Sequence, residues 1–500
     1  MKLLVLLMTA SFVLVEVNLS EIFRNGRTLG GNVGVPKPDK HRENVADVPD
    51  EWFTQKLDHF NPTDERTWQQ RYLFNDQYFD PNTGGPVFLM IGGEGEAPVE
   101  WMTGGSWVDD AEKHGALLLQ LEHRYYGKSH PTEDMSTENL KYLTSQQALA
   151  DLATFITAMN KNYSLPSDVK WIAFGGSYPG SLAAWLRFKY PHLVHGAVSS
   201  SSPLLAKVDF SNYFKVVRES LAAYSDDCVA AVQQGVREIG TLLKDEGGRK
   251  NLNKIFNLCT PIQESLEKPL DISNFYEMIA DNFGEVVQEN GANRNSSQAN
   301  ANITIDAVCE ILVNQTIGSH VNRLGKVNDL LLITRDEKCM DYQYEKMIDS
   351  LRNVSWDSEE DEGDRQWMYQ LCTEFGFFTT SSNESHIFGD KFPTSFFIQQ
   401  CKDIFGDSYD EDFIDGAVDH TNMLYGGFDI EVSNVVYVYG SIDPWHALGI
   451  TKTLDKKAPA IYIEGTAHCV DLYSPADTDS AQLTAARQKV SQLIESWLKL

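Results

Sequence analysis

The chain has 500 residues, which is too long for one compact core of ordinary size, so either two domains or one domain with a large insertion is expected. Its 71 acidic residues outnumber its 42 basic residues. Because this charge balance repels nucleic-acid phosphates and anionic membrane surfaces, no nucleic-acid partner is predicted.

The amino terminus has the pattern of a secretory signal. Lys2 precedes an apolar run from Leu3 to Val15, which is too short to span a bilayer. Residues 1–18 are therefore predicted to be a removable signal peptide, with an uncleaved anchor as the alternative, and no membrane span is expected after its removal. Residues 19–50, rich in glycine, proline and charge, are predicted to be a flexible lead-in or a pro-segment.

Residues 51–206 alternate short apolar runs with helical patterns. Strands are predicted at 86–91, 116–122, 170–174 and 196–200, and helices at 145–159 and 181–190. Near-continuous apolar strands separated by helices indicate a parallel sheet that is covered on both faces. Residues 425–500 return to this pattern, with strands predicted at 435–440 and 460–465 and a helix at 480–498.

Residues 207–424, between these two parts, are polar, cysteine-rich and helical in pattern. One α/β core interrupted by a helical cap insertion accounts for this organisation. Six of the seven cysteines lie in the insertion and could form three disulfides in an oxidising compartment, with fifteen pairings open. Six sequons outside the signal predict glycosylation, five of them in the insertion: Asn162, Asn295, Asn302, Asn314, Asn353 and Asn383.

The stretch "WIAFGGSYPGSLAAW" (171–185) has the layout of a nucleophile elbow, with a strand, a glycine-serine turn and a helix that begins with small residues. Ser177 is the predicted nucleophile. Pro179 stands where the last glycine of the Gly-x-Ser-x-Gly pattern is expected. Proline is tolerated in the first turn of a helix, where its missing N–H would have no intrahelical partner, so the elbow is predicted to be intact.

The acid and the base are predicted from chain order, because in this architecture each follows a C-terminal strand. Asp443 lies just past the strand at 435–440, and His468 lies just past the strand at 460–465. Ser177 would attack a carbonyl, His468 would transfer the proton, and Asp443 would orient and stabilise the imidazole. His446 shares the loop of Asp443, whereas the base is expected from a separate strand end.

The oxyanion is predicted to bind the N–H groups of Tyr178 and of Gly93, in the glycine loop after the strand at 86–91. That loop lacks the third glycine of a dinucleotide fingerprint, and no cofactor is predicted. His192 and His195 lack further ligands at metal-site spacing, and no metal site is predicted.

Several motifs together resemble one peptidase family. They are "WFTQKLDHFNP" (52–62), "GGEGE" (92–96), "LEHRYYGKSHP" (121–131), "FGGSYPGSLAAWLRFKYPHLV" (174–194), "GSIDPWHALG" (440–449) and "GTAHCVDLY" (465–473). With them the chain resembles the serine peptidase family of lysosomal prolyl carboxypeptidase and dipeptidyl peptidase II, and within it the thymus-specific serine protease branch. The resemblance covers both parts of the core in order.

The resemblance implies an α/β-hydrolase core with a helical cap, a triad on Ser177, Asp443 and His468, and exopeptidase action at Pro-X bonds. It also implies three disulfides, which leave Cys469 as a buried free thiol: Cys228 with Cys309, Cys259 with Cys339, and Cys372 with Cys401. The best-known members have a glycine in place of Pro179, a second histidine in place of Cys469 and a nearby arginine. These departures are shared with the thymus-specific branch, so strict proline specificity is not implied.

Three residues are candidates for substrate binding. Glu94 and Glu122 could receive the amino terminus of a peptide, although Glu122 is more simply explained by an ion pair with Arg124. Trp445 could stack on a substrate proline or could belong to the core.

The expected function is a secreted or lysosomal serine exopeptidase acting on short peptides. An esterase or lipase on the same fold and a catalytically silent binding protein are the alternatives. A homodimer is left open.

Overall fold

The computed structural model describes residues 48–80, 84–292, 303–335, 337–356, 363–382 and 386–499. The predicted signal peptide, most of the lead-in and three of the six sequons (Asn295, Asn302 and Asn383) lie outside the described residues.

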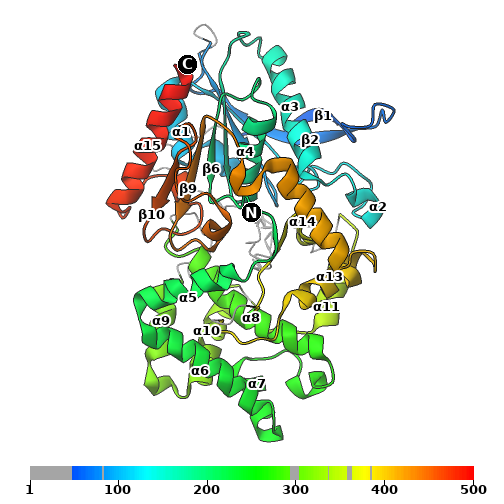
Figure 1. Ribbon diagram of the computed structural model, residues 1–500, viewed down its shortest axis with the longest axis vertical. Coiled ribbons are helices and arrows are strands. Elements are labelled where there is room, and N and C mark those ends of the chain that lie inside the picture. The colour runs from blue at the N-terminus through cyan, green and yellow to red at the C-terminus, as the bar shows by residue number, and fades with distance from the viewer. Residues whose placement is uncertain are drawn as a thin grey trace, which may run out of the picture.

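An eight-stranded sheet forms the centre of the fold, with the strand order β1-β2-β4-β3-β5-β6-β9-β10 (Figure 1). Its strands are β1 (Glu51–Lys56), β2 (Thr67–Asn75), β3 (Val87–Ile91), β4 (Leu117–Leu121), β5 (Trp171–Gly176), β6 (Gly196–Ser200), β9 (Val435–Gly440) and β10 (Ala460–Ile463). All neighbouring strands from β4 to β10 are parallel, and only the pairings of β2 with the edge strand β1 and with β4 are antiparallel. This topology confirms the expected α/β-hydrolase core.

The central strands are buried on both faces because helices cover each side. Successive residues of a strand point to opposite faces, and in β3 Val87 packs in one apolar cluster while Phe88 packs in the other. The cluster of Val87 includes residues of α3 (Ser145–Asn162) and α4 (Tyr178–Lys189). The cluster of Phe88 includes residues of α1 (Ser106–His114) and α15 (Ala481–Leu498).

The predicted strands and helices of the core are all present, with bounds within a few residues of those expected. The sequence patterns do not predict the β1–β2 hairpin. Its strands lie at the sheet edge and carry many polar side chains, and Trp52 in β1 is exposed, so the buried apolar run typical of the central strands is missing.

We call residues 207–424 the cap. It is mostly helical and lies between β6 and β9 in the chain, so it interrupts the sheet only in sequence. Its longer helices are α5 (Asn212–Tyr224), α6 (Asp226–Leu242), α7 (Glu246–Ile255), α8 (Pro269–Gln288), α9 (Ile305–Val313), α10 (His320–Thr334), α11 (Tyr344–Leu351), α12 (Asp364–Gln370), α13 (Thr394–Phe405) and α14 (Glu411–Tyr425). In Figure 1, α5 to α10 lie below the sheet.

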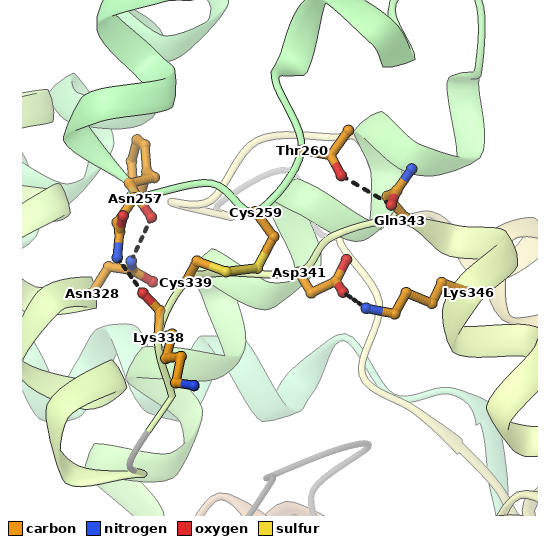
Figure 2. Close-up of a disulfide and its surroundings, with 10 residues drawn as sticks. Asn257, Cys259, Thr260, Asn328, Lys338, Cys339, Asp341, Gln343 and Lys346 are labelled. Atoms are coloured by element: carbon orange, nitrogen blue, oxygen red, sulfur yellow. Dashed lines mark hydrogen bonds and ion pairs between the residues drawn. A yellow bond between two sulfur atoms is a disulfide. The ribbon is translucent and has the colours of Figure 1, made fainter.

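Three disulfides cross-link the cap, and they are the pairs that the family resemblance implied: Cys228–Cys309, Cys259–Cys339 and Cys372–Cys401. Figure 2 shows Cys259–Cys339 with a polar contact on either side. The side chain of Asn257 donates to the carbonyl oxygen of Lys338 at 2.6 Å, and Thr260 donates to Gln343 at 3.0 Å. Cys469 carries a buried free thiol.

Candidate active site

Ser177 lies in a sharp turn between β5 and α4. Its φ of 59° and ψ of −134° are strained for a residue with a side chain. The turn is fixed on the strand side because the N–H of Ser177 donates to the carbonyl oxygen of Ser200 in β6 at 2.9 Å. Pro179 lies in the first turn of α4, where its missing N–H costs no intrahelical bond. Ser177 is 8% exposed.

Glycine allows the strand and the helix to approach closely at this turn. A Cβ atom on Gly175 would lie 2.1 Å from the carbonyl oxygen of Pro179. A Cβ atom on Gly180 would lie 2.7 Å from the carbonyl oxygen of Ser200. Neither position can carry a side chain without moving the backbone, so both glycines maintain the sharp turn.

Asp443 follows β9 and His468 follows β10. Both therefore lie at the edge formed by the carboxyl ends of the parallel strands, where Ser177 follows β5. Nδ1 of His468 donates to Oδ1 of Asp443 at 2.8 Å, and both side chains are buried. The same carboxylate oxygen accepts the main-chain N–H of Trp445 at 3.0 Å. The carboxylate therefore selects the tautomer of His468 that leaves Nε2 unprotonated when the ring is neutral.

The electrostatic environment of His468 is dominated by burial and by this carboxylate. Burial acts to lower the pKa of His468, but the Asp443 carboxylate outweighs it and holds that pKa well above its usual value. Nε2 of His468 is buried and makes no hydrogen bond to any residue that the structure describes, Ser177 included. Catalytic hydrogen bonds of substrate-free enzymes are often long and tighten only when substrate binds.

The two predicted oxyanion donors lie after β5 and β3. Tyr178 is the first residue of α4, so its main-chain N–H has no partner within the helix. Its buried hydroxyl is held by Gln370 and His123, each at 3.1 Å. In the glycine loop, the N–H of Gly92 already donates to Leu121, which leaves Gly93 as the next donor in the loop.

The prediction that Glu122 forms an ion pair with Arg124 is wrong. Glu122 pairs with Arg71 of β2 at 2.9 Å, whereas Arg124 pairs with Asp151 of α3 at 2.6 Å. The two residues lie in the turn after β4, where the chain leaves the sheet, and their side chains meet different elements. Both ion pairs join residues that are distant in the sequence, so closeness in the sequence did not predict the partners of Glu122 and Arg124.

Glu122 is fully engaged with the protein itself. Besides Arg71, its carboxylate accepts the main-chain N–H groups of Ala97 and Lys128 and the hydroxyl of Ser129. These contacts fasten the glycine loop to the turn after β4. Glu94, in the same loop, is also buried.

Trp445 belongs to a buried aromatic cluster between the sheet edge and the cap. It is 2% exposed, and its ring lies 5.4 Å from that of Phe210 and 6.5 Å from that of His468. Its Nε1 donates to the side chain of Gln288, the last residue of α8, at 2.9 Å. Sequence reasoning missed Gln288, because no local motif marks a cap residue that reaches the loops of Asp443 and His468.

Three predicted sequon asparagines within the described ranges, Asn162, Asn314 and Asn353, are exposed. Within these ranges, none of the helices combines the length and apolar character needed to cross a bilayer.

Comparisons with known proteins agree on one family. The family model described as serine carboxypeptidase S28 matches residues 55–490. A Caenorhabditis elegans protein is 38% identical across 100% of this chain and 99% of its own length. The mouse thymus-specific serine protease is 36% identical (90% of this chain, 87% of that protein), and the human lysosomal Pro-X carboxypeptidase is 29% identical (90% and 88%).

A search of solved structures found a proline iminopeptidase of Mycobacterium smegmatis, which is 11% identical with a TM-score of 0.37. The match covers 89% of this chain and 99% of that structure.

Proposed function

The chain belongs to the serine carboxypeptidase S28 family and is a serine peptidase, and from that premise we propose that it hydrolyses short peptides through a triad of Ser177, Asp443 and His468. The observation that carries the assignment is the 2.8 Å hydrogen bond between His468 and Asp443, at the sheet edge where the strained Ser177 turn also lies. A serine elbow, a buried carboxylate and an oriented imidazole at one edge are the parts that acyl transfer needs.

The proposed reaction proceeds through an acyl-enzyme. Oγ of Ser177 attacks the scissile carbonyl and gives its proton to Nε2 of His468, which then passes that proton to the leaving amine. Asp443 stabilises the imidazolium that forms between these steps. The N–H groups of Tyr178 and Gly93 stabilise the negative charge on the carbonyl oxygen. Water then hydrolyses the acyl-enzyme by the same proton transfers in reverse.

We propose that the substrates are short peptides cut near one end, with a preference for Pro-X bonds. The cap packs against the loop of the proposed acid. Its residues Gln288, Phe210 and Tyr213 contact Trp445, which lies two residues after Asp443. A cap in this position would restrict access to chain ends. The name of the human relative includes Pro-X carboxypeptidase, which supports this substrate class.

We place the enzyme in a secreted or lysosomal lumenal compartment. The signal pattern, the three disulfides and the exposed sequons at Asn162, Asn314 and Asn353 support an oxidising, glycosylating route.

The decisive experiment combines a fluorophosphonate probe with a mixed peptide library. The probe is expected to label the native protein covalently and to leave Ser177→Ala unlabelled. Ser181→Ala is the matched control, because the Ser181 hydroxyl is buried against the carbonyl oxygen of Pro203 in the same elbow. Cleavage sites read by mass spectrometry should cluster near peptide ends and after proline. Labelling that persists in Ser177→Ala would refute the nucleophile, and internal cleavage without end preference would refute the exopeptidase assignment.

A further inference from the structure

A cavity of about 230 Å³ is lined by residues of the sheet, of the helices α1 and α15 and of the segment that follows His468. Figure 1 shows α1 and α15 together on one side of the sheet. The apolar part of the lining includes Phe174 of β5 and Val198 of β6. The polar part includes Asp110 and Lys113 of α1, Arg487 of α15, and Asp471 in the segment after the catalytic histidine.

Two of the lining carboxyl groups are buried, and each has a serine hydroxyl as its side-chain partner. Asp110 is 8% exposed and accepts the hydroxyl of Ser491 at 2.5 Å. Asp471 is 6% exposed and accepts the hydroxyl of Ser200 at 2.5 Å. Among the described residues, neither carboxyl group takes part in an ion pair.

The two basic residues that line the cavity, Lys113 and Arg487, donate to acceptors other than the carboxyl groups of Asp110 and Asp471. Lys113 pairs with Glu495 at 3.3 Å. Arg487 pairs with Asp479 and donates to the main-chain oxygens of Val470 and Asp471. Within the described ranges, neither basic residue forms an ion pair with Asp110 or Asp471, although the charge of Lys113 acts to lower the pKa of Asp110 and that of Arg487 the pKa of Asp471. Burial outweighs both effects, so the two carboxyl groups are costly to ionise, and a cationic ligand in direct contact would relieve that cost.

We propose that this cavity binds a small primary amine, with its ammonium group between Asp110 and Asp471 and its apolar body against Phe174 and Val198. A cavity of roughly 150 Å³ lined by apolar side chains holds a benzene ring, so the present volume accommodates an aromatic ring with a short aminoalkyl arm. The proposal is independent of peptidase activity and requires only that the chain be folded.

Binding should depend on pH, because the ammonium needs ionised partners. Burial raises the pKa of Asp110, and it raises the pKa of Asp471 to about 6. Lys113 and Asp109 of α1 act on Asp110, while Arg487 of α15 and Asp443 of the catalytic loop act on Asp471. As the pH falls through about 6, Asp471 becomes protonated and amine affinity should drop.

The test is calorimetric titration of the full chain with phenethylamine and with phenethyl alcohol, an uncharged molecule of similar shape. The protein is first labelled with fluorophosphonate, so that the catalytic serine is blocked. Near neutral pH the amine is expected to bind about tenfold more tightly than the alcohol, because a charge-assisted hydrogen bond is stronger than a neutral one.

Asp110→Asn and Asp471→Asn preserve size and the acceptor for the serine hydroxyl, and each is expected to weaken amine binding by about tenfold. Glu112→Gln is the matched control, since Glu112 is an exposed acid of α1 outside the cavity lining, and it should leave binding unchanged. Equal affinity for amine and alcohol, no binding of the amine, or amine binding that survives both Asn substitutions overturns the proposal. The comparison of amine with alcohol uses the native chain, so it tests the proposal even if the Asn variants do not fold.

Discussion

The main-chain N–H of His468 donates a 3.0 Å hydrogen bond to the carbonyl oxygen of Gln288, the last residue of the cap helix α8. The side-chain oxygen of the same Gln288 accepts Nε1 of Trp445, two residues after Asp443. One cap residue thus holds both the loop of the proposed base and the loop of the proposed acid. The cap is therefore connected to both loops that carry the proposed acid and base.

Gln288→Ala tests this connection. The substitution keeps the main-chain acceptor for His468 but removes the side-chain acceptor of Trp445 and Tyr213. We expect kcat/KM to fall by about tenfold, since small displacements of catalytic groups cost orders of magnitude. Asn282→Ala, on the same helix, is the control, because Asn282 contacts Asn328 within the cap and should affect stability only. Unchanged kcat/KM in Gln288→Ala would show that the contact only serves packing.

Asp443→Asn should lower kcat by about four orders of magnitude, as loss of the orienting carboxylate does in other triads. It should also shift the pH profile. A general base works only when deprotonated, and Asp443 raises the pKa of His468, so the acid limb of kcat/KM should lie above pH ~6.5 and move lower in the variant. Asp455→Asn, an exposed loop acid, should leave the whole profile in place. An acid limb that stays fixed in Asp443→Asn contradicts the assignment.

Glu374 should make the protein more stable at acidic pH. Burial raises the pKa of this carboxyl group to about 7, although hydrogen bonds from Ser145 act to lower it. The folded state therefore retains a proton that the unfolded state loses above about pH 4.5, so the free energy of unfolding falls as pH rises from there to about 7, by up to about 3 kcal/mol. Glu374→Gln should flatten this dependence in denaturant titrations, while Glu138→Gln, at an exposed position, should preserve it. The idea fails if the Glu374→Gln variant and the native chain show the same slope.

Replacing Cys259 and Cys339 together by serine should lower the free energy of unfolding by about 2–5 kcal/mol, the usual effect of losing a native disulfide. The pair closes a long loop, with a sequence separation of 80 residues, so its loss frees a large part of the unfolded cap. Cys469→Ser is the comparison, because this thiol is free. If equilibrium unfolding of the double variant matched that of the native chain, the disulfide would have no stabilising role.

The parts of the molecule that could be predicted are those with a local signature. The buried strands show as apolar runs, and the turn at Ser177 shows as two glycines, a serine and a helix. The position of Gln288 could not be predicted, since its contacts with His468 and Trp445 depend on how a distant helix docks. The partner of Glu122 was missed for the same reason, because Arg71 comes from β2, the strand next to the edge, which carries no strong apolar pattern.

The close contact at Gly175 has a consequence for the detection of such enzymes in genomes. The atom that a side chain at position 175 would strike is the main-chain oxygen of Pro179, which every amino acid possesses. The geometry thus forbids substitution at the first glycine of the Gly-x-Ser-x-Gly pattern while it tolerates proline at the last. A pattern search that requires both glycines discards this chain, whereas one that requires the first glycine and the serine, and leaves the last position open, retains it.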